Sequence, residues 1–253
     1  MASKAPQDPT LAFLFFFAIG LVFLLFGFDR LRFKQRIENT PTSKVRSIAM
    51  GPVEVSGQIV ASDQGLLEAP FTGSPCVYYE YNVEEYVGGK NRSWKTVASG
   101  EQSKRFFIRD ETGQVMVDST DADIELPHDF LQVGTRDPPE RVQAFLTSKK
   151  ISNKGFFGFS KNMRYSEWHL APDDVVFVTG EAGDNPYVAE GTAVEGVKDV
   201  LISQGKSEFF FISDKSEKKV LDGLRWTVWG FIFGGLALCA FALGQLFLYW
   251  KIF

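Results

Sequence analysis

Two long apolar segments without a charged side chain, one near each end, constrain this chain of 253 residues more than any other feature. The first, residues 10–28, contains seven Phe and five Leu. At a rise of 1.5 Å per residue it forms a helix of about 28 Å, close to the ~30 Å hydrocarbon core of a bilayer. The second, residues 226–250, is longer and equally free of charge. The sequence therefore predicts two transmembrane helices that enclose a water-soluble domain.

The boundaries of these parts follow from the flanking residues. We expect transmembrane helix 1 at residues 10–28, a soluble domain at 30–213, and a juxtamembrane helix that continues into transmembrane helix 2 at 214–250. Asp214 and Glu217 have the spacing of a capping box, and no proline interrupts the sequence after them. The first run is followed at once by charged residues, which is typical of a retained span and not of a cleaved signal peptide.

Basic residues flank both apolar runs on the side of the middle domain. They are Arg30, Arg32, Lys34 and Arg36 after the first run, and Lys218, Lys219 and Arg225 before the second. Lys4 and Lys251 are the basic residues on the far sides. The positive-inside rule then predicts a two-pass protein of the plasma membrane, with the soluble domain in the cytoplasm and both termini outside.

Composition and motifs exclude several classes of function. A net charge of −4 argues against nucleic-acid binding, which usually requires a basic surplus. Cys76 lies in the middle domain and Cys239 in the second apolar run, so no disulfide framework is expected. The sequence contains no HExxH, GxSxG, P-loop or paired CxxC motif. We therefore expect no metal, no cofactor and no catalytic residue.

The pattern of the middle domain is mostly that of β-strands. Alternating or short apolar segments bounded by turn residues occur at 53–59, 76–87, 94–98, 106–109, 115–118, 175–178 and 209–212. One helix is predicted between Pro138 and Lys150. The fold class is then α+β, mainly β, with antiparallel strands in a barrel or a sandwich. The length allows one sizeable core or two small ones divided near residues 137–139.

A basic and aromatic stretch follows the predicted helix and suggests a surface that contacts a membrane or a partner. Its members are Lys149, Lys150, Lys154, Phe156, Phe157, Phe159, Lys161 and Arg164. Cations near anionic lipid contribute about 1 kcal/mol each, and aromatic rings favour the interface. The alternative is that the Phe side chains belong to the core and the Lys side chains form a solvated edge.

Two further features carry hypotheses of their own. Gly230 and Gly234 form a GxxxG motif in the second run, which lets a helix approach closely. The companion helix is either the first span or a second copy of the chain. A catalytic alternative uses Cys76 with a histidine such as His169, or the Glu80 and Glu84 side chains, although Cys76 also fits a small buried residue.

Several blocks of the sequence resemble the GIDE domain, which is also called the BAM ("beside a membrane") domain. The similar segments are 37–47, 51–57, 71–79 with the sequence FTGSPCVYY, 83–86, 107–115 and 211–217. They cover nearly the whole soluble part, and the layout with two spans agrees with this family.

The best-known members of that family are mitochondrial membrane-anchored E3 ubiquitin and SUMO ligases, in which a RING follows the second span. A RING needs about eight Cys or His zinc ligands, whereas only residues 251–253 follow the second run here. The resemblance then implies a RING-less, prokaryotic relative. We expect a non-catalytic binding, scaffold or sensing module whose partners are membrane lipids and a protein or a second copy. The alternatives are a structural subunit of a membrane complex and an enzyme that uses Cys76.

Overall fold

The computed structural model describes residues 10–39, 42–88, 92–155, 158–187, 199–205, 209–214 and 217–250. The side chains of residues 36–39 and 217–224 lie outside this description. The chain forms two compact units. One contains the two terminal helices, α1 (Thr10–Asn39) and α3 (Glu217–Trp250), and the other contains the residues between them.

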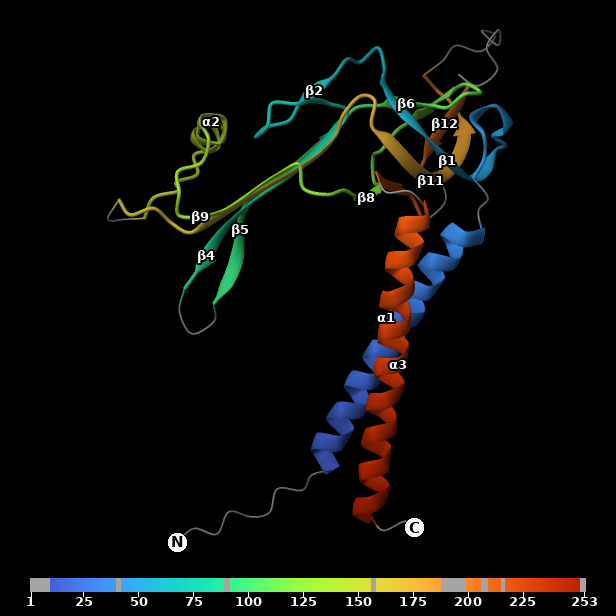
Figure 1. Cartoon of the computed structure of the whole chain (residues 1–253), viewed down its shortest axis with the longest axis vertical. Helices are drawn as coiled ribbons and strands as arrows, with labels where there is room; N and C mark the ends of the chain where they lie inside the picture. The colour runs from blue at the N-terminus through green and yellow to red at the C-terminus, as the bar shows by residue number, and fades with distance from the viewer. Residues whose placement is uncertain are drawn as a thin grey trace. The chain divides into compact units, whose positions relative to one another are not determined.

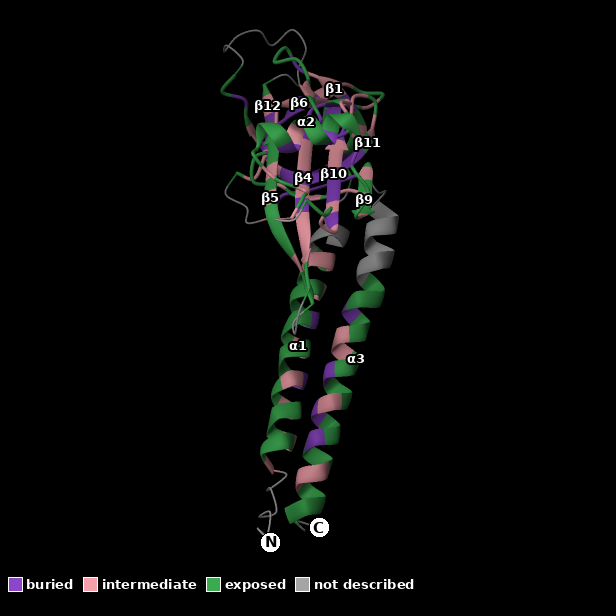
Figure 2. Cartoon of the chain, turned by 90° about the vertical axis from the view of Figure 1, so that its left-hand side faces the viewer, coloured by how far each residue is buried: buried purple, intermediate pink, exposed green. Residues whose placement is uncertain are grey.

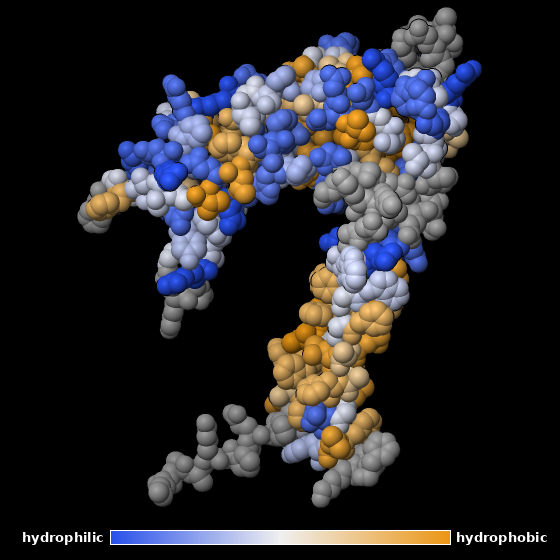
Figure 3. Space-filling model, viewed as in Figure 1, coloured by the Kyte–Doolittle hydropathy of each residue, from blue (hydrophilic) through white to orange (hydrophobic). Residues whose placement is uncertain are grey.

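The helical unit is a pair of antiparallel helices (Figure 1). Residues Thr10–Gln35 and Arg225–Trp250 are long and apolar enough to cross a membrane. Only 11% and 17% of their most apolar windows are buried, so these helices are not the core of a soluble fold. Figure 2 shows mostly exposed residues along both helices, and Figure 3 shows that their surface is largely apolar. A helix that is long and apolar enough to cross a membrane therefore lies toward each end of the described chain, as the sequence predicts, and this layout indicates a membrane protein.

Glycines allow the two helices to pack closely. A Cβ added at Gly20 of α1 would lie 2.5 Å from the Cys239 sulfur and 3.0 Å from the Gly235 carbonyl oxygen. A Cβ at Gly235 would in turn lie 2.8 Å from the Gly20 carbonyl oxygen. The rings of Phe23 and Phe231 meet edge to face nearby, with centroids 5.5 Å apart. Because the residues at the crossing are small, the backbones of the two helices come into contact.

The second unit contains a closed five-stranded barrel. Its strands, in order around the barrel, are β1 (Gly51–Ala61), β6 (Phe106–Arg109), β7 (Gln114–Val117), β12 (Val200–Ser203) and β11 (Val175–Asp184), which pairs again with β1. All neighbours are antiparallel except β7 and β12. Two short strands, β13 (Phe211–Ser213) and β8 (Asp123–Glu125), extend the sheet from β11. The α+β, mainly β fold class predicted from the sequence is confirmed.

The length of β1 closes the barrel. Residues 51–58 pair with β11, and residues 58–61 pair with β6. Gly57 lies at this change of partner, where an added Cβ would collide with the Arg109 carbonyl group. Alternate residues of the strands point into one core, which includes Val55, Ile59, Phe106, Ile108, Val115, Val117, Val178, Ile202 and Ile212.

A second sheet carries its own smaller core. Its order is β5 (Ser93–Ser103), β4 (Tyr78–Val87), β10 (Met163–Leu170) and β9 (Phe130–Gly134). Helix α2 (Glu140–Ser148) covers one face through Val142 and Leu146, which pack with the buried residues Phe71, Tyr81, Val83, Met163 and Tyr165. The short strands β2 (Leu67–Glu68) and β3 (Pro75–Cys76) pair beside it, and a single 3-10 turn, Val45–Ser47, precedes β1.

Candidate functional site

The basic and aromatic stretch noted in the sequence divides into two parts with different surroundings. Lys149 and Lys150 follow α2 and are exposed, as is Lys154. Phe159 is 78% exposed in a turn that is closed by a bond from the Gly155 N–H to the Phe159 carbonyl oxygen, 2.8 Å long. Phe156 and Phe157 lie outside the described residues. The described residues of this part are thus exposed cations and an exposed aromatic ring, which is the composition expected of a contact surface.

The other part of the stretch is engaged in the second sheet. Lys161 forms an ion pair with Glu85 (Nζ–Oε2, 2.9 Å), and Arg164 forms one with Glu84 (3.1 Å). The Arg164 guanidinium also lies 4.1 Å from the ring centroid of Trp94. These two cations therefore join β10 and its preceding loop to β4 and β5.

The glycines of the GxxxG motif lie away from the helix crossing. A Cβ added at Gly230 would meet no atom within 4 Å, and one at Gly234 would meet only Phe23, at 3.9 Å. The close contacts belong to Gly20 and Gly235 instead. Among the residues that the structure describes, the Gly230 face of α3 is therefore open.

The basic residues that set the predicted topology lie at the expected ends of the helices. Arg30 and Arg32 are exposed, Lys34 is half-buried, and Arg225 is exposed at the start of the apolar part of α3. Arg36, Lys218 and Lys219 are helical, and their side chains lie outside the description.

A buried carboxylate fixes the segment that carries the sequence FTG. Glu167 of β10 is fully buried and accepts bonds from the N–H groups of Phe71 and Thr72, the latter 3.1 Å long. The Thr72 hydroxyl donates a third bond of 2.6 Å. Charge-assisted bonds of this kind compensate the cost of burying the carboxylate. Glu167 is therefore a structural anchor, which the sequence pattern did not reveal.

The surroundings of Cys76 argue against a nucleophile. The thiol is fully buried, and burial together with the nearby charges of Glu167 and Asp129 raises its pKa to about 12. It is therefore protonated at neutral pH, whereas the thiolate is the reactive form. His169 Nδ1 lies 3.4 Å from Asp129 Oδ2, so this imidazole is directed toward a carboxylate.

A crevice with acidic and aromatic walls lies between β4, β10 and the end of β8. Its lining residues are Tyr78, Glu80, Ile124, Glu125, Leu126 and Trp168, and its volume is about 240 Å³. Antiparallel register places Glu80 opposite Trp168 on one side and opposite Glu101 on the other. The crevice is therefore built by residues that are distant in the sequence.

The electrostatics of this crevice favour a positive ligand. The Tyr78 hydroxyl lies 3.4 Å from Glu80 Oε2 and 3.3 Å from Glu101 Oε2, so one donor is shared between two carboxylates. Burial and the charge of Glu101 raise the pKa of Glu80. In the described part of the chain, no Lys or Arg forms an ion pair with either carboxylate. A bound cation would relieve this repulsion.

Aromatic rings complete the crevice. Trp168 forms one wall, and the His128 ring packs against it with centroids 4.7 Å apart and planes at 38°. An indole ring beside carboxylates is suited to an ammonium or guanidinium group. The alternating pattern of β4 indicated a polar face with Glu80, but it could not identify Trp168 as its neighbour. Among the described residues, no group of three or more His, Cys, Asp or Glu could hold a metal ion.

Comparison with known families gives a match over most of the chain. Residues 77–244 match the model of the GIDE family, which is described as E3 Ubiquitin ligase. This segment extends from the start of β4 through most of α3, about two thirds of the chain. The comparison with curated proteins found no match, and neither did the comparison with solved structures.

Proposed function

The chain belongs to the GIDE family, and we propose that it is a membrane-anchored binding module that recruits a protein partner without modifying it covalently. Its 253 residues contain two Cys and two His, fewer than the about eight zinc ligands of a RING. The proposal therefore assigns to these residues the binding of a partner and not the zinc-dependent recruitment of an E2. A protonated Cys76 thiol is a poor nucleophile, which also supports a binding role without covalent chemistry.

We place the binding domain at the cytoplasmic face of the plasma membrane. The basic residues Arg30, Arg32 and Arg225 lie at the ends of the spans that lead into the domain. Such residues are retained on the cytoplasmic side during insertion. The partner is then a cytoplasmic protein or the cytoplasmic part of another membrane protein.

The observation that carries this proposal is the crevice of Tyr78, Glu80 and Trp168. Its volume of about 240 Å³ suits a single long side chain. The Glu80 carboxylate, which shares the Tyr78 hydroxyl with Glu101 behind the crevice wall, and the Trp168 indole favour a cation. A cation–π contact contributes about 0.5–2 kcal/mol, depending on desolvation. We therefore assign to the crevice a Lys or Arg side chain from a basic segment of the partner.

A titration with short peptides tests the proposed ligand class. The full chain in mild detergent would be titrated with acetyl-Lys-Lys-Lys-amide and with the corresponding Gln peptide. We expect saturable binding of the Lys peptide only, with roughly tenfold weaker affinity for Glu80→Gln, since a charge-assisted bond contributes about 1.5–3 kcal/mol. Trp168→Leu should also weaken binding, whereas Glu111→Gln, an exposed carboxylate outside the crevice, is the matched control.

The outcomes separate the alternatives. Equal affinity of wild type, Glu80→Gln and Trp168→Leu would contradict the assignment to the crevice. Purification from native membranes, with wild type beside Glu80→Gln, would then identify the partner by mass spectrometry. A protein that is lost in the variant supports the binding module. A protein that remains at fixed stoichiometry in both would instead favour a structural subunit of a membrane complex.

A further inference from the structure

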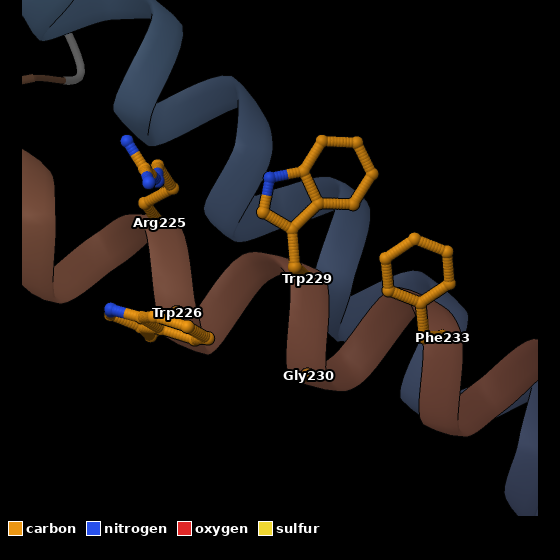
Figure 4. A pocket seen from close by; sticks show the side chains of 5 residues that line it. All are labelled: Arg225, Trp226, Trp229, Gly230 and Phe233. Carbon is orange, nitrogen blue, oxygen red and sulfur yellow. The ribbon is translucent and has the colours of Figure 1, made fainter.

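The helical unit has a groove of its own at the end of α3 where the apolar segment begins. Its volume is about 520 Å³, within the roughly 300–1,000 Å³ range of pockets that hold small ligands. It is lined by Arg225, Trp226, Trp229, Gly230 and Phe233. Figure 4 shows that Arg225, Trp229 and Phe233 project from the same side of the helix, as residues four apart do.

The chemistry of the groove changes in order along the helix axis. The guanidinium of Arg225 comes first, at the boundary of the membrane-spanning segment. The indole of Trp229 follows, and its N–H is a hydrogen-bond donor. The ring of Phe233 then stacks on that indole, with centroids 5.3 Å apart and planes at 22°. A permanent cation, a donor and an apolar wall thus succeed one another from the interface toward the bilayer centre.

Gly230 keeps the groove open. No atom lies within 4 Å of a Cβ added at this position, so even a small side chain would occupy free space in the groove. In the part of the chain that the structure describes, Arg225 forms no ion pair with a carboxylate. The cation and the open wall are therefore both available to a molecule from the membrane.

We propose that this groove binds one anionic phospholipid, whose phosphate pairs with Arg225 and the Trp229 N–H and whose acyl chain lies along Gly230 and Phe233. Guanidinium and phosphate form strong charge-assisted bonds, and an indole ring favours the level of the headgroups. The polar-to-apolar order of the groove matches that of a phospholipid. This proposal is independent of the peptide-binding crevice in the other unit.

A second copy of α3 fits the groove less well than a lipid. Close helix pairs need small residues on both sides of the contact. Here Gly230 is surrounded by the bulky side chains of Trp226, Trp229 and Phe233, which would hold a second backbone away. A symmetric pair formed about this groove would also bring one Arg225 near the other, and two like charges repel.

Native mass spectrometry of the full chain tests this site. The protein in mild detergent would be mixed with dioleoyl phosphatidylglycerol or with dioleoyl phosphatidylcholine. We expect one tightly held phosphatidylglycerol per chain, at least fivefold more bound than phosphatidylcholine. Arg225→Gln and Gly230→Leu should each reduce the bound fraction at least fivefold. Gly244→Leu is the matched control, because this glycine of α3 also has no atom within 4 Å of an added Cβ.

The charge control is Arg32→Gln, which removes an exposed cation from the other helix. It should leave lipid binding unchanged, and circular dichroism should show that all variants keep their helical content. Equal lipid binding by wild type, Arg225→Gln and Gly230→Leu would overturn the proposal and indicate a nonspecific lipid shell. Dimers that disappear in Gly230→Leu while lipid binding is unchanged would assign the groove to a second copy.

Discussion

At the scale of single residues, buried ionisable groups make the stability of the second unit depend on pH. The Cys76 thiol is fully buried beside Glu167 and Asp129, and its pKa rises from 9.0 to about 12. Burial raises the pKa of Tyr165 from 10.0 to about 12 as well. Both groups keep their protons in the folded chain at pH values at which the unfolded chain loses them. Alkaline pH therefore lowers the free energy of unfolding through both groups.

This difference predicts that stability falls as pH rises. The contribution of Cys76 is fully present below pH 9, the unfolded value, and is lost progressively as pH approaches 12, the folded value. Tyr165 adds a loss of the same sign from pH 10. We expect urea unfolding, followed by tryptophan fluorescence in mild detergent, to show a steeper decline between pH 8 and 11 for wild type than for Cys76→Ala.

Val77→Ala provides the control for this prediction. Val77 is the neighbouring residue and is equally buried, but it has no ionisable group. The substitution should lower the free energy of unfolding by a similar amount at every pH, so its curve runs parallel to that of wild type. Identical slopes for wild type and Cys76→Ala would show that the thiol does not remain protonated in the folded chain.

Single residues also show what the sequence could not provide. In the sequence Glu167 is only one acid beside a basic stretch, because nothing local indicates that its carboxylate accepts bonds from the Phe71 and Thr72 amides. The position of Trp168 in the crevice could not be predicted from local sequence either. Its role in the crevice depends on the register of β10 against β4, which is a property of pairing between segments about 88 residues apart.

At the scale of elements, local patterns located some strands and missed others. The alternation in β4 correctly indicated the face with Tyr81 and Val83, which packs in the second core. Strand β10 was missed, because Ser166 and Glu167 are buried polar residues that break the expected pattern. The pairing of β12 with β7, which completes the barrel, is parallel and joins distant segments. Such pairings have no local signature.

The crossing of α1 and α3 leads to a prediction about helix packing. Gly235→Val would place side-chain atoms against the Gly20 carbonyl oxygen, 2.8 Å from the new Cβ, and against Leu24. Overpacking of this kind typically costs about 1–3 kcal/mol. We expect a lower midpoint of thermal unfolding in detergent, measured by circular dichroism. Gly244→Val, at an open position of the same helix, should stay near the wild-type midpoint.

The Gly235 variant also distinguishes two views of the small residues in α3. If the helices pack mainly through the Gly230 and Gly234 motif, Gly230→Val would lower the midpoint and Gly235→Val would not. The structure predicts the reverse order, because the backbone contact is made by Gly235 and Gly20. Within this chain the close contact is made by Gly20 and Gly235. Whether the GxxxG motif of Gly230 and Gly234 packs against a second copy stays a prediction.

At the scale of the whole molecule, two antiparallel spans place both connections to the middle domain on the same side of the membrane. Gly20 meets Cys239 and Gly27 meets Ile232, so residue numbers rise along α1 as they fall along α3. Arg30 and Arg32 at one end of the pair and Arg225 at the same end give both spans the same preferred orientation. This charge pattern predicts that the domain lies in the cytoplasm.

Cysteine labelling in membrane vesicles measures this orientation. Asp63, an exposed residue in the turn after β1, would be changed to Cys in a chain that carries Cys76→Ala and Cys239→Ser. We expect a membrane-impermeant maleimide to label inside-out vesicles and to spare right-side-out ones. Replacement of Arg30, Arg32 and Lys34 by Gln should increase labelling of the right-side-out vesicles, because the charge bias at α1 is then removed. Labelling of the otherwise unchanged chain in right-side-out vesicles would contradict the prediction. The crevice and Arg225 would then both face the outside of the cell, and their partners would have to be sought there.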